Sequence, residues 1–457
     1  MQALAPRKLS FGWMVTITSL AFVVAQLDVS IVNIALPQIA QTYRSDISTL
    51  QWIIDAYTLA FAVLMLSAGS LSDLLGAKRI FQLGMLVFGI ASIGCGMAWD
   101  APSLIGFRVM QGIGAATMIP SSLSILNHAF SHEPGTRARA VGLWTALGSS
   151  AIALGPVIGG LLIEVSNWRF IFFVNAPLCA VGLLLSTWLP QSSPGKGKGF
   201  DFKGQLVWML CITALIAAII EYPHFGPQHP MIYGGLTFSA LMLVLFLRIE
   251  RKVPHPMLPL YLFKSATFNV LLTLGAVLNG AYYGSVFILS LYLQNVLHYP
   301  TLIAGLAFLP LTVGFVISNV LSGRVINKYG LRLPILGGLA LFATGFAGLL
   351  LVAKADTPYW QLLLPFIALP MGMGMAVPAM TTGTLASVDK SLSGTASASL
   401  NTVRQASGAI GVAVFGAVAT GGSSSILHAV AFSAGISLIC IALVWTLVYK
   451  WVSNTFS

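Results

Sequence analysis

The amino-acid sequence predicts an all-α membrane protein. Of its 457 residues, 57% are hydrophobic and only 8% are charged, whereas soluble domains carry roughly 25% charged residues. Apolar runs of about 20 residues, the length of helix that crosses a bilayer, recur from one end of the chain to the other. A membrane β-barrel would instead show short strands of alternating polarity, and no such alternation dominates this sequence.

We count fourteen candidate membrane spans, and the loops that join them are too short to form a sizeable soluble domain. We do not expect the first span to be a cleaved signal peptide, because it is too long, carries Asp28 and lacks a small-residue cleavage pattern. The candidate spans lie near residues 12–36, 50–71, 80–98, 103–125, 140–163, 170–189, 204–221, 231–247, 267–292, 302–322, 333–352, 359–380, 396–419 and 426–448.

The formal net charge of +11 reflects topology rather than nucleic-acid binding. If the N-terminus is cytoplasmic, 18 of the 23 Lys and Arg residues fall in cytoplasmic segments, and only Arg44, Arg169 and Lys354 fall outside. The other two, Arg108 and Arg404, lie within spans. An excess of Lys and Arg in cytoplasmic loops is the positive-inside pattern. It predicts that both termini lie in the cytoplasm, and nucleic acid is not an expected partner.

The sequence shows no pattern of a catalytic or metal site. Its four cysteines all lie in apolar spans, where we expect packing residues rather than a disulfide framework. We find no phosphate-binding loop of the Walker type, no metal-ligand spacing and no nucleophile elbow. We therefore predict that the chain is not an enzyme and holds no metal and no organic cofactor. A membrane enzyme or a receptor is the distant alternative.

A short pattern occurs twice and predicts two halves of like topology. Residues 69–79 and 323–332 both read Gly, three residues, Asp or Asn, two residues, Gly and then basic residues, and each copy lies in a predicted cytoplasmic turn. Halves of like topology are common among transporters. We therefore expect a six-helix bundle at 1–190, a linker with two additional transmembrane helices at 191–265, and a second six-helix bundle at 266–457.

Six segments, in order and at the expected spans, together carry a family resemblance. They are Leu27–Pro37, Gly69–Arg79, Arg108–Gly114, Ala146–Gly160, Trp168–Pro177 and Asn401–Gln405. Over nearly its whole length the chain resembles the fourteen-span drug:proton antiporters of the major facilitator superfamily, the group that contains the QacA- and EmrB-like multidrug exporters. The resemblance implies the major facilitator fold, with two six-helix bundles and two inserted helices.

Asp28, Asp55 and Arg108 are charged residues inside apolar spans. A charge at the centre of a membrane helix costs about 2.5–3.5 kcal/mol on the lenient insertion scale, so such a residue usually serves a site. Counted from the predicted span ends at 1.5 Å per residue, all three lie roughly 8–12 Å below the outer surface. We expect them to face a common cavity, where one acid pairs with the arginine and the remaining acid can take a proton or a cationic ligand. The alternative is a static polar network that holds the helices together.

The resemblance sharpens this expectation. In these antiporters, acids of the first spans are associated with proton coupling and cationic substrates, and the fourth-span arginine with proton transfer. Asp28, Asp55 and Arg108 match those places. Spans nine to fourteen contain no Asp or Glu, which argues against a high proton stoichiometry and against doubly charged substrates.

The first copy of the repeated pattern is predicted to be a cytoplasmic latch between the halves, as the resemblance implies. Gly76 permits a positive φ, and an acid can sit at a helix N-terminus or bridge to an arginine. A plain tight turn whose charges set the topology is the alternative. The latch residues are Gly69, Asp73, Gly76, Lys78 and Arg79.

The fifth span carries small residues and a proline. Small residues let another helix approach closely, and a proline bends its helix. The resemblance implies a bent interface between the halves that favours antiport, and ordinary packing is the alternative. The residues of this antiporter motif are Gly148, Gly155, Pro156, Gly159 and Gly160.

Polar and aromatic side chains of several spans are candidates for lining a large central cavity, because stacking and cation–π contacts suit flat or cationic drugs. Tyrosines near span ends are also common anchors at the membrane surface. The cavity candidates are Asn33, Tyr57, Gln111, Asn279, Tyr282, Tyr283 and Tyr292.

Together these features predict a secondary transporter. We expect proton-coupled efflux of lipophilic, cationic drugs, dyes or antiseptics across a bacterial cytoplasmic (inner) membrane by alternating access, with protons as the coupling ion. The expected partners are those small molecules and membrane lipids, and the expected state is a monomer. Export of an endogenous metabolite, a lipid or a self-made antibiotic by the same fold is the alternative.

Overall fold

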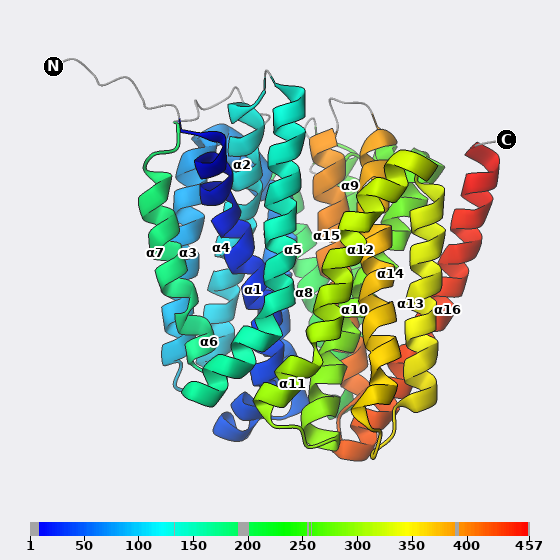
Figure 1. The fold of residues 1–457 in the computed structure, drawn as a ribbon. Coiled ribbons are helices and arrows are strands. Elements are labelled where there is room, and N and C mark those ends of the chain that lie inside the picture. The colour runs from blue at the N-terminus through cyan, green and yellow to red at the C-terminus, as the bar shows by residue number, and fades with distance from the viewer. Residues whose placement is uncertain are drawn as a thin grey trace.

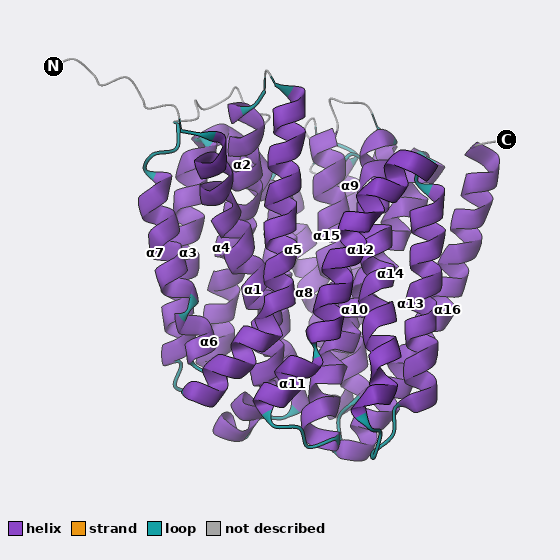
Figure 2. Ribbon diagram, in the orientation of Figure 1, coloured by secondary structure: helices purple, strands orange, loops and turns teal. Residues whose placement is uncertain are grey.

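The computed structural model describes residues 9–131, 133–190, 201–253, 256, 258–388 and 393–455. These residues form a bundle of long helices that run roughly side by side, and the described part of the chain contains no strand (Figures 1 and 2). Helix α1 begins and helix α16 ends at the same end of the bundle, at the top of Figure 1. We call this the termini end, and the opposite end, predicted to face outside, the far end.

The helices fall into three sets along the chain. The first set is α1 (Phe11–Tyr43), α2 (Ile47–Leu75), α3 (Ala77–Met97), α4 (Ala101–Ala129), α5 (Pro134–Val165), α6 (Phe170–Phe173) and α7 (Asn175–Ser186). The second is α8 (Phe202–Phe225) and α9 (Pro230–Glu250). The third is η1 (Leu260–Lys264), α10 (Ala266–Leu291), η2 (Tyr292–Val296), α11 (Thr301–Ala307), α12 (Leu309–Tyr329), α13 (Arg332–Val352), α14 (Tyr359–Ala386), α15 (Ser393–Val418) and α16 (Ser423–Thr455).

Local sequence sets the helix ends. The Asp46 side chain accepts the Thr49 backbone N–H at 2.9 Å and so caps α2. Asp100 and Ser103 cap α4 reciprocally, and the hydrogen bonds from Ser103 hold the pKa of the Asp100 carboxyl below its usual value. Between α2 and α3 the chain turns at Gly76, whose φ of 94° favours glycine, as the sequence predicts.

The described residues contain eleven helices long and apolar enough to cross a membrane, and twelve when the two arms of α5 are taken as one bent span. Residues Phe170–Ser186, which include α6 and α7, form a shorter apolar helical segment. The prediction of an all-helical membrane protein is confirmed. The count of fourteen spans stays a prediction.

The first and third sets each pack as a helical bundle. In the first set α1 packs against α5, and α4 packs against α2 and α3. In the third set α10 packs against α15, and α14 packs against α12 and α13. We call α1–α7 the N-half and α10–α16 the C-half. The boundaries predicted at 190 and 265 stay predictions.

Hydrogen bonds join the two halves near the far end. Gln51 Nε2 of α2 donates to the carbonyl oxygens of Val412 at 3.0 Å and Ala413 at 2.7 Å in α15. Ser290 Oγ of α10 donates to the Asn33 carbonyl oxygen of α1 at 2.6 Å. These residues lie within the far-end portions of their helices, so the structure is closed at that end.

The same end is also closed along α5. Gln38 of α1 donates to Thr301 Oγ1 of α11 at 3.3 Å. Gly160 of α5 lies so close to α11 that an added Cβ would meet the Leu302 Cα at 3.1 Å. Figure 1 shows α11 beside the far-end portion of α5. A side chain at position 160 would therefore require α11 to shift slightly away from α5.

The hairpin of α8 and α9 covers one seam between the halves. Helix α8 packs against both α2 and α15. It is bound to α2 by three hydrogen bonds along its length: Gln205 Nε2 to the Val63 carbonyl at 2.8 Å, Ser48 Oγ to the Ile220 carbonyl at 3.1 Å, and Trp52 Nε1 to Glu221 Oε1 at 2.9 Å.

Its contact with α15 is apolar. Ile212, Ile216 and Ile220 of α8 share a buried cluster with the small side chains of Ala409 and Ala413. Helix α9 lies outside α8, and only 17% of its most apolar stretch is buried inside the protein. Among the contacts of the described residues, the hairpin is therefore hydrogen-bonded to the N-half and packed through apolar side chains against the C-half.

Candidate functional site

A buried ion pair lies in the N-half. An Nη atom of Arg108 contacts a carboxylate oxygen of Asp28, and both side chains are almost completely enclosed. Arg108 Nε donates to the Ile53 carbonyl oxygen at 3.0 Å, so α4 holds α1 and α2 through one guanidinium. The Tyr57 ring lies against that guanidinium, with 4.4 Å from Cζ to the ring centre.

Neutral side chains complete the coordination of this pair. The other oxygen of Asp28 accepts Gln111 Nε2 at 3.1 Å and Asn175 Nδ2 at 2.9 Å. Gln111 also accepts from Arg108 Nη1 at 2.8 Å and donates to Ser92 Oγ at 2.7 Å. We call Asp28, Ser92, Arg108, Gln111 and Asn175 the Asp28 cluster. It joins α1, α3, α4 and α7, and its formal charges cancel.

Sequence reasoning placed Asp28 and Arg108 in this site but missed Asn175 and Ser92. Asn175 belongs to the segment Trp168–Pro177 that contributes to the family resemblance, but nothing in its spacing shows that it contacts Asp28. Ser92 is one of many serines in apolar spans, and the sequence carries no signal for it. Gln111 was predicted as a cavity residue, and the structure places it in the cluster instead.

Asp55 lies apart from the Asp28 cluster, which differs from the expectation of one shared site. It is two residues from Tyr57 on the same helix, and residues at that spacing point to opposite sides. Its Oδ1 accepts Thr58 Oγ1 at 3.3 Å. Its Oδ2 has no hydrogen-bond partner among the described residues, although the side chain is fully enclosed.

The neighbours of Asp55 on α2 show which way it faces. Gln51, one turn before it, binds carbonyl oxygens of α15, and Leu59, one turn after it, packs with Ala409 and Ala413 of α15 and with α8. Residues four apart share a helix face. Asp55 therefore faces the seam of α2, α8 and α15, whereas Asp28 points into the N-half.

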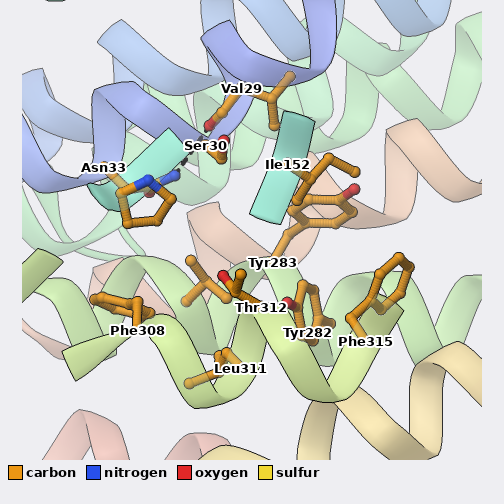
Figure 3. Close-up of a pocket in the computed structure, with 12 residues that line it drawn as sticks. Val29, Ser30, Asn33, Ile152, Tyr282, Tyr283, Phe308, Leu311, Thr312 and Phe315 are labelled. Atoms are coloured by element: carbon orange, nitrogen blue, oxygen red, sulfur yellow. Dashed lines mark hydrogen bonds between the residues drawn. The ribbon is translucent and has the colours of Figure 1, made fainter. Parts of the chain in front are cut away.

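A pocket lies between the halves, and we call it the central pocket. In Figure 3, residues of α1 and α5 line one side of the pocket, and residues of α10 and α12 line the other. Of the predicted cavity residues, Asn33, Tyr282 and Tyr283 line it. The complete lining is Val29, Ser30, Asn33, Ile152, Pro156, Tyr282, Tyr283, Val286, Phe308, Leu311, Thr312 and Phe315.

The remaining predictions for the cavity differ from the structure. Neither Asp28 nor Asp55 lines this pocket, although Val29 and Ser30, the next residues after Asp28, do. Tyr57 lies beside Arg108. Tyr292 donates to the Lys354 carbonyl oxygen at 2.6 Å near the far end, where it ties α10 to the α13–α14 connection.

Asn279 contacts a second arginine inside the bundle. Arg404 Nε of α15 donates to Asn279 Oδ1 of α10 at 3.4 Å, and Arg404 Nη1 donates to Asn401 Oδ1 at 3.4 Å. Both acceptors are neutral, and no carboxylate in the described residues forms an ion pair with Arg404. The two arginines in spans thus have different surroundings: Arg108 is neutralised by an acid, and Arg404 is not.

The predicted latch residues are only partly described. Gly76 adopts the predicted positive φ, and Arg79 is exposed. Lys78 donates to the Thr187 and Leu189 carbonyl oxygens at 2.8 and 2.6 Å, so it binds the end of α7 within the N-half. Gly69 lies within α2, and the side chain of Asp73 lies outside the described residues. A latch between the halves stays a prediction.

The glycines of α5 pack mainly against α1. A Cβ at Gly155 would meet the Ser30 Cβ at 2.8 Å and the Ile31 backbone nitrogen at 3.0 Å, and Gly159 faces Ile31 as well. Gly148 faces the ring of Phe22 in the same way. Most of the predicted antiporter motif therefore brings two helices of one half together.

Two residues of that motif reach the other half. The Pro156 carbonyl oxygen faces Gly305 of α11, and Gly160 faces Leu302. Helix α5 bends by 42° between its arms Gly135–Ile152 and Leu154–Val165. Proline has no N–H to donate to the carbonyl of Ile152, four residues earlier, so the bend coincides with the missing hydrogen bond.

Among the described residues, no group of three or more His, Cys, Asp or Glu side chains could hold a metal ion. The four cysteines are free, and Cys95 donates to Gln111 Oε1 at 3.2 Å beside the Asp28 cluster. The polar chemistry of the bundle interior is therefore that of carboxylates, amides, hydroxyls and guanidinium groups.

Residues 18–412 match the Major Facilitator Superfamily. The methylenomycin A resistance protein of Bacillus subtilis is 36% identical over 402 residues, which cover 88% of this chain and 86% of that protein. The puromycin resistance protein of Streptomyces alboniger is 34% identical over 465 residues, which cover 95% and 91%. The multidrug resistance protein Stp of Mycobacterium tuberculosis is 33% identical over 403 residues, which cover 88% and 74%.

Two solved structures share the fold at low sequence identity. A point mutant of a nucleoside transporter aligns with a TM-score of 0.68 at 12% identity and covers 95% of this chain and 99% of its own. A bacterial homologue of the human lysosomal transporter Spinster, in an inward-facing and unoccupied conformation, aligns with a TM-score of 0.67 at 15% identity and covers 99% and 100%.

Proposed function

Because this chain belongs to the major facilitator superfamily of transporters, we propose that it exports lipophilic drug-like molecules by alternating access and that proton entry drives the export. The buried Asp28–Arg108 pair is the observation that supports proton coupling. Asp28 lies on α1 directly before Val29 and Ser30, two residues that line the central pocket. The names of relatives that confer resistance to methylenomycin A, puromycin and several drugs support export of small molecules.

The central pocket suits a flat apolar cargo. Aromatic rings of Tyr282, Tyr283 and Phe315 give stacking surface, and Asn33, Ser30 and Thr312 give a few polar contacts. Ligand sites of this kind are mostly apolar with few polar groups that orient the ligand. The pocket lies between the halves, so a rocking motion of one half against the other exposes it to each side of the membrane in turn.

Protonation of Asp28 is the coupling event in this proposal. A neutral Asp28 no longer neutralises Arg108, and the hydrogen bonds from Gln111 and Asn175 must rearrange. Helix α1 carries both Asp28 and the pocket residues Val29, Ser30 and Asn33. A shift of α1 on protonation therefore changes the pocket wall, and this links proton binding to cargo release.

Asp55 is the second proton carrier in this proposal. A charged carboxylate with an unpartnered oxygen is costly in a buried seam, so Asp55 holds a proton while the far end is closed. It takes up that proton when α2 and α15 separate there and water from the outside reaches it. The proton thus stabilises the closed seam, and a potential of 100 mV contributes about 2.3 kcal/mol per charge moved.

The experiment is export in everted membrane vesicles, with puromycin and a dye panel, before and after nigericin collapses the pH gradient. We expect gradient-driven uptake by the wild type and none by Asp28→Asn at matched membrane levels. Asp46→Asn is the control, because Asp46 is an exposed cap outside the bundle interior. Gradient-driven transport by Asp28→Asn would refute the role of Asp28 in proton coupling. If the wild type transports none of the compounds, the export of lipophilic drug-like molecules is refuted.

A cationic cargo was expected because two acids were predicted to face the cavity. Neither acid lines the central pocket, and Asp28 is neutralised by Arg108. Export of an endogenous metabolite or a self-made antibiotic uses the same pocket and the same cycle. Drug-susceptibility profiles of a deletion strain separate these cargoes from foreign drugs.

A further inference from the structure

Arg404 is a positive charge inside the bundle that no carboxylate among the described residues neutralises. It lies 11 residues into α15, about 16 Å from the helix start at 1.5 Å per residue. From residue 266 to the C-terminus the chain contains two acids, Asp356 and Asp389, and both lie outside the predicted spans. The described residues offer no carboxylate partner, which is unusual for a charge at membrane depth.

The contacts of Arg404 within the protein are weak. Its hydrogen bonds to Asn279 Oδ1 and Asn401 Oδ1 are both 3.4 Å long and go to neutral amides. Arg108 differs in each respect, because it contacts a carboxylate, a carbonyl oxygen at 3.0 Å and an amide oxygen at 2.8 Å. A guanidinium has five N–H donors, so most of the donor capacity of Arg404 is left for another acceptor.

Arg404 lies beside the central pocket. Tyr283 lines the pocket and packs against Gly408, where an added Cβ would meet its Cδ2 at 3.2 Å. Arg404 is one turn from Gly408 on α15, and its acceptor Asn279 is one turn from Tyr283 on α10. The step from Gly408 to Arg404 and the step from Tyr283 to Asn279 both run toward the termini end. The guanidinium therefore flanks the end of the pocket that faces the termini end, and its side chain is partly exposed.

We propose that Arg404 binds an anionic group, a carboxylate, on the exported compound; this rests on the export function proposed above. A guanidinium binds a carboxylate through two parallel hydrogen bonds, and such charge-assisted bonds are stronger in a low-dielectric interior. The apolar part of the compound then lies among Tyr282, Tyr283 and Phe315. The cargo supplies a negative charge beside Arg404, where the described residues provide no ion-pair partner.

The charge balance of the site favours an anion over a cation. The pocket lining contains no acid, and the nearest acid on α1, Asp28, is already paired with Arg108. Asp55 faces a different seam. A cationic cargo in this pocket would meet the uncompensated charge of Arg404 and no carboxylate, and like charges close together in a low-dielectric site repel strongly.

The test compares two probes that share one ring system and differ in charge, naphthalene-1-acetate and naphthalene-1-acetamide. Binding to the full-length protein in phosphatidylcholine nanodiscs is measured by titration calorimetry at pH 7 without any gradient. We expect the wild type to bind the acetate at least tenfold more tightly than the amide, a difference of about 1.4 kcal/mol. Arg404→Gln should remove this preference, and Arg404→Lys should keep part of it.

Arg251→Gln is the matched control, because Arg251 is exposed after α9 and outside both halves. Equal preference for the acetate in Arg404→Gln and the wild type would overturn the assignment. Loss of acetate binding when phosphatidylglycerol replaces half of the lipid would also overturn it, since the site would then hold a lipid headgroup. If vesicles export the panel compounds while the preference is absent, the carboxylate site fails and the export function stands.

Discussion

Asn175 Nδ2 lies 2.9 Å from Asp28 Oδ1, although 147 positions separate the two residues in the chain. The contact brings the start of α7 against the middle of α1, on the side of the carboxylate that Arg108 leaves free. A carboxylate that accepts two neutral donors as well as a guanidinium is held in one orientation. Asn175 therefore helps to position the acid on which proton coupling is proposed to depend.

Asn175→Ala should lower both stability and export. Removing one donor from a buried carboxylate costs about 1–3 kcal/mol, because the Asp28 oxygen loses a partner that water cannot replace. We expect a lower Tm in detergent and reduced gradient-driven uptake in vesicles. The control is Asn167→Ala, since Asn167 is exposed in the turn before α6. An unchanged Tm for Asn175→Ala would show that this hydrogen bond contributes nothing.

Gly155→Ala should disturb the contact between α5 and α1. The new Cβ would lie 2.8 Å from the Ser30 Cβ and 3.0 Å from a backbone nitrogen, which side-chain rotation cannot relieve. Overpacking of this kind costs about 1–3 kcal/mol. Gly142→Ala on the same helix is the control, because nothing lies within 4 Å of a Cβ there. Thermal unfolding of the two variants should differ, and equal Tm values would contradict the close approach.

A short reversible cross-link between positions 38 and 301 should hold the far end closed. The side-chain ends of Gln38 and Thr301 lie 3.3 Å apart across the two halves, so cysteines placed there in a cysteine-free background should react with a short bis-methanethiosulfonate linker. We expect transport to stop on cross-linking and to return after dithiothreitol, since the cycle requires this end to open. Each single-cysteine variant is a control. Full transport by the cross-linked protein would argue against alternating access.

The α8–α9 hairpin should move with the N-half. Its hydrogen bonds go to α2, and its contact with α15 is apolar and involves two alanines. Spin labels at exposed Leu241 on α9, Ile90 on α3 and Leu443 on α16 allow the comparison. When pH or ligand shifts the conformation, the 241–90 distance should stay constant and the 241–443 distance should change. The opposite result would place the hairpin with the C-half.

The sequence predicts the helical membrane class and the importance of Asp28 and Arg108, because both follow from where charge is tolerated in apolar runs. The sequence does not predict which of the two acids forms the ion pair with Arg108. Asp28 and Asp55 lie at similar depth by counting, but the rotation of each helix about its axis decides that one meets Arg108 and the other faces α15. That rotation depends on packing between distant segments, which spacing within one helix does not encode.

Arg404 also shows that the sequence does not predict the contacts of a charged residue within a span. Its segment contributes to the family resemblance, and its depth marks it as unusual. Only the folded chain shows that its neighbours are the amides of Asn279 and Asn401 rather than an acid. The glycines of α5 behave similarly, since the sequence predicts close helix contact but not that α1 is the main partner.

The position of α8 has a consequence for how a membrane-dissolved compound enters. Helix α8 fills the outside of the α2–α15 seam, with Ile212 and Ile216 against Ala409 and Ala413. In the described part of the chain, that flank is therefore closed to the lipid at the level of these residues. If a hydrophobic compound enters from the bilayer, we expect it to enter at the opposite flank, where α5 packs against α12, so the two flanks of the transporter are not equivalent.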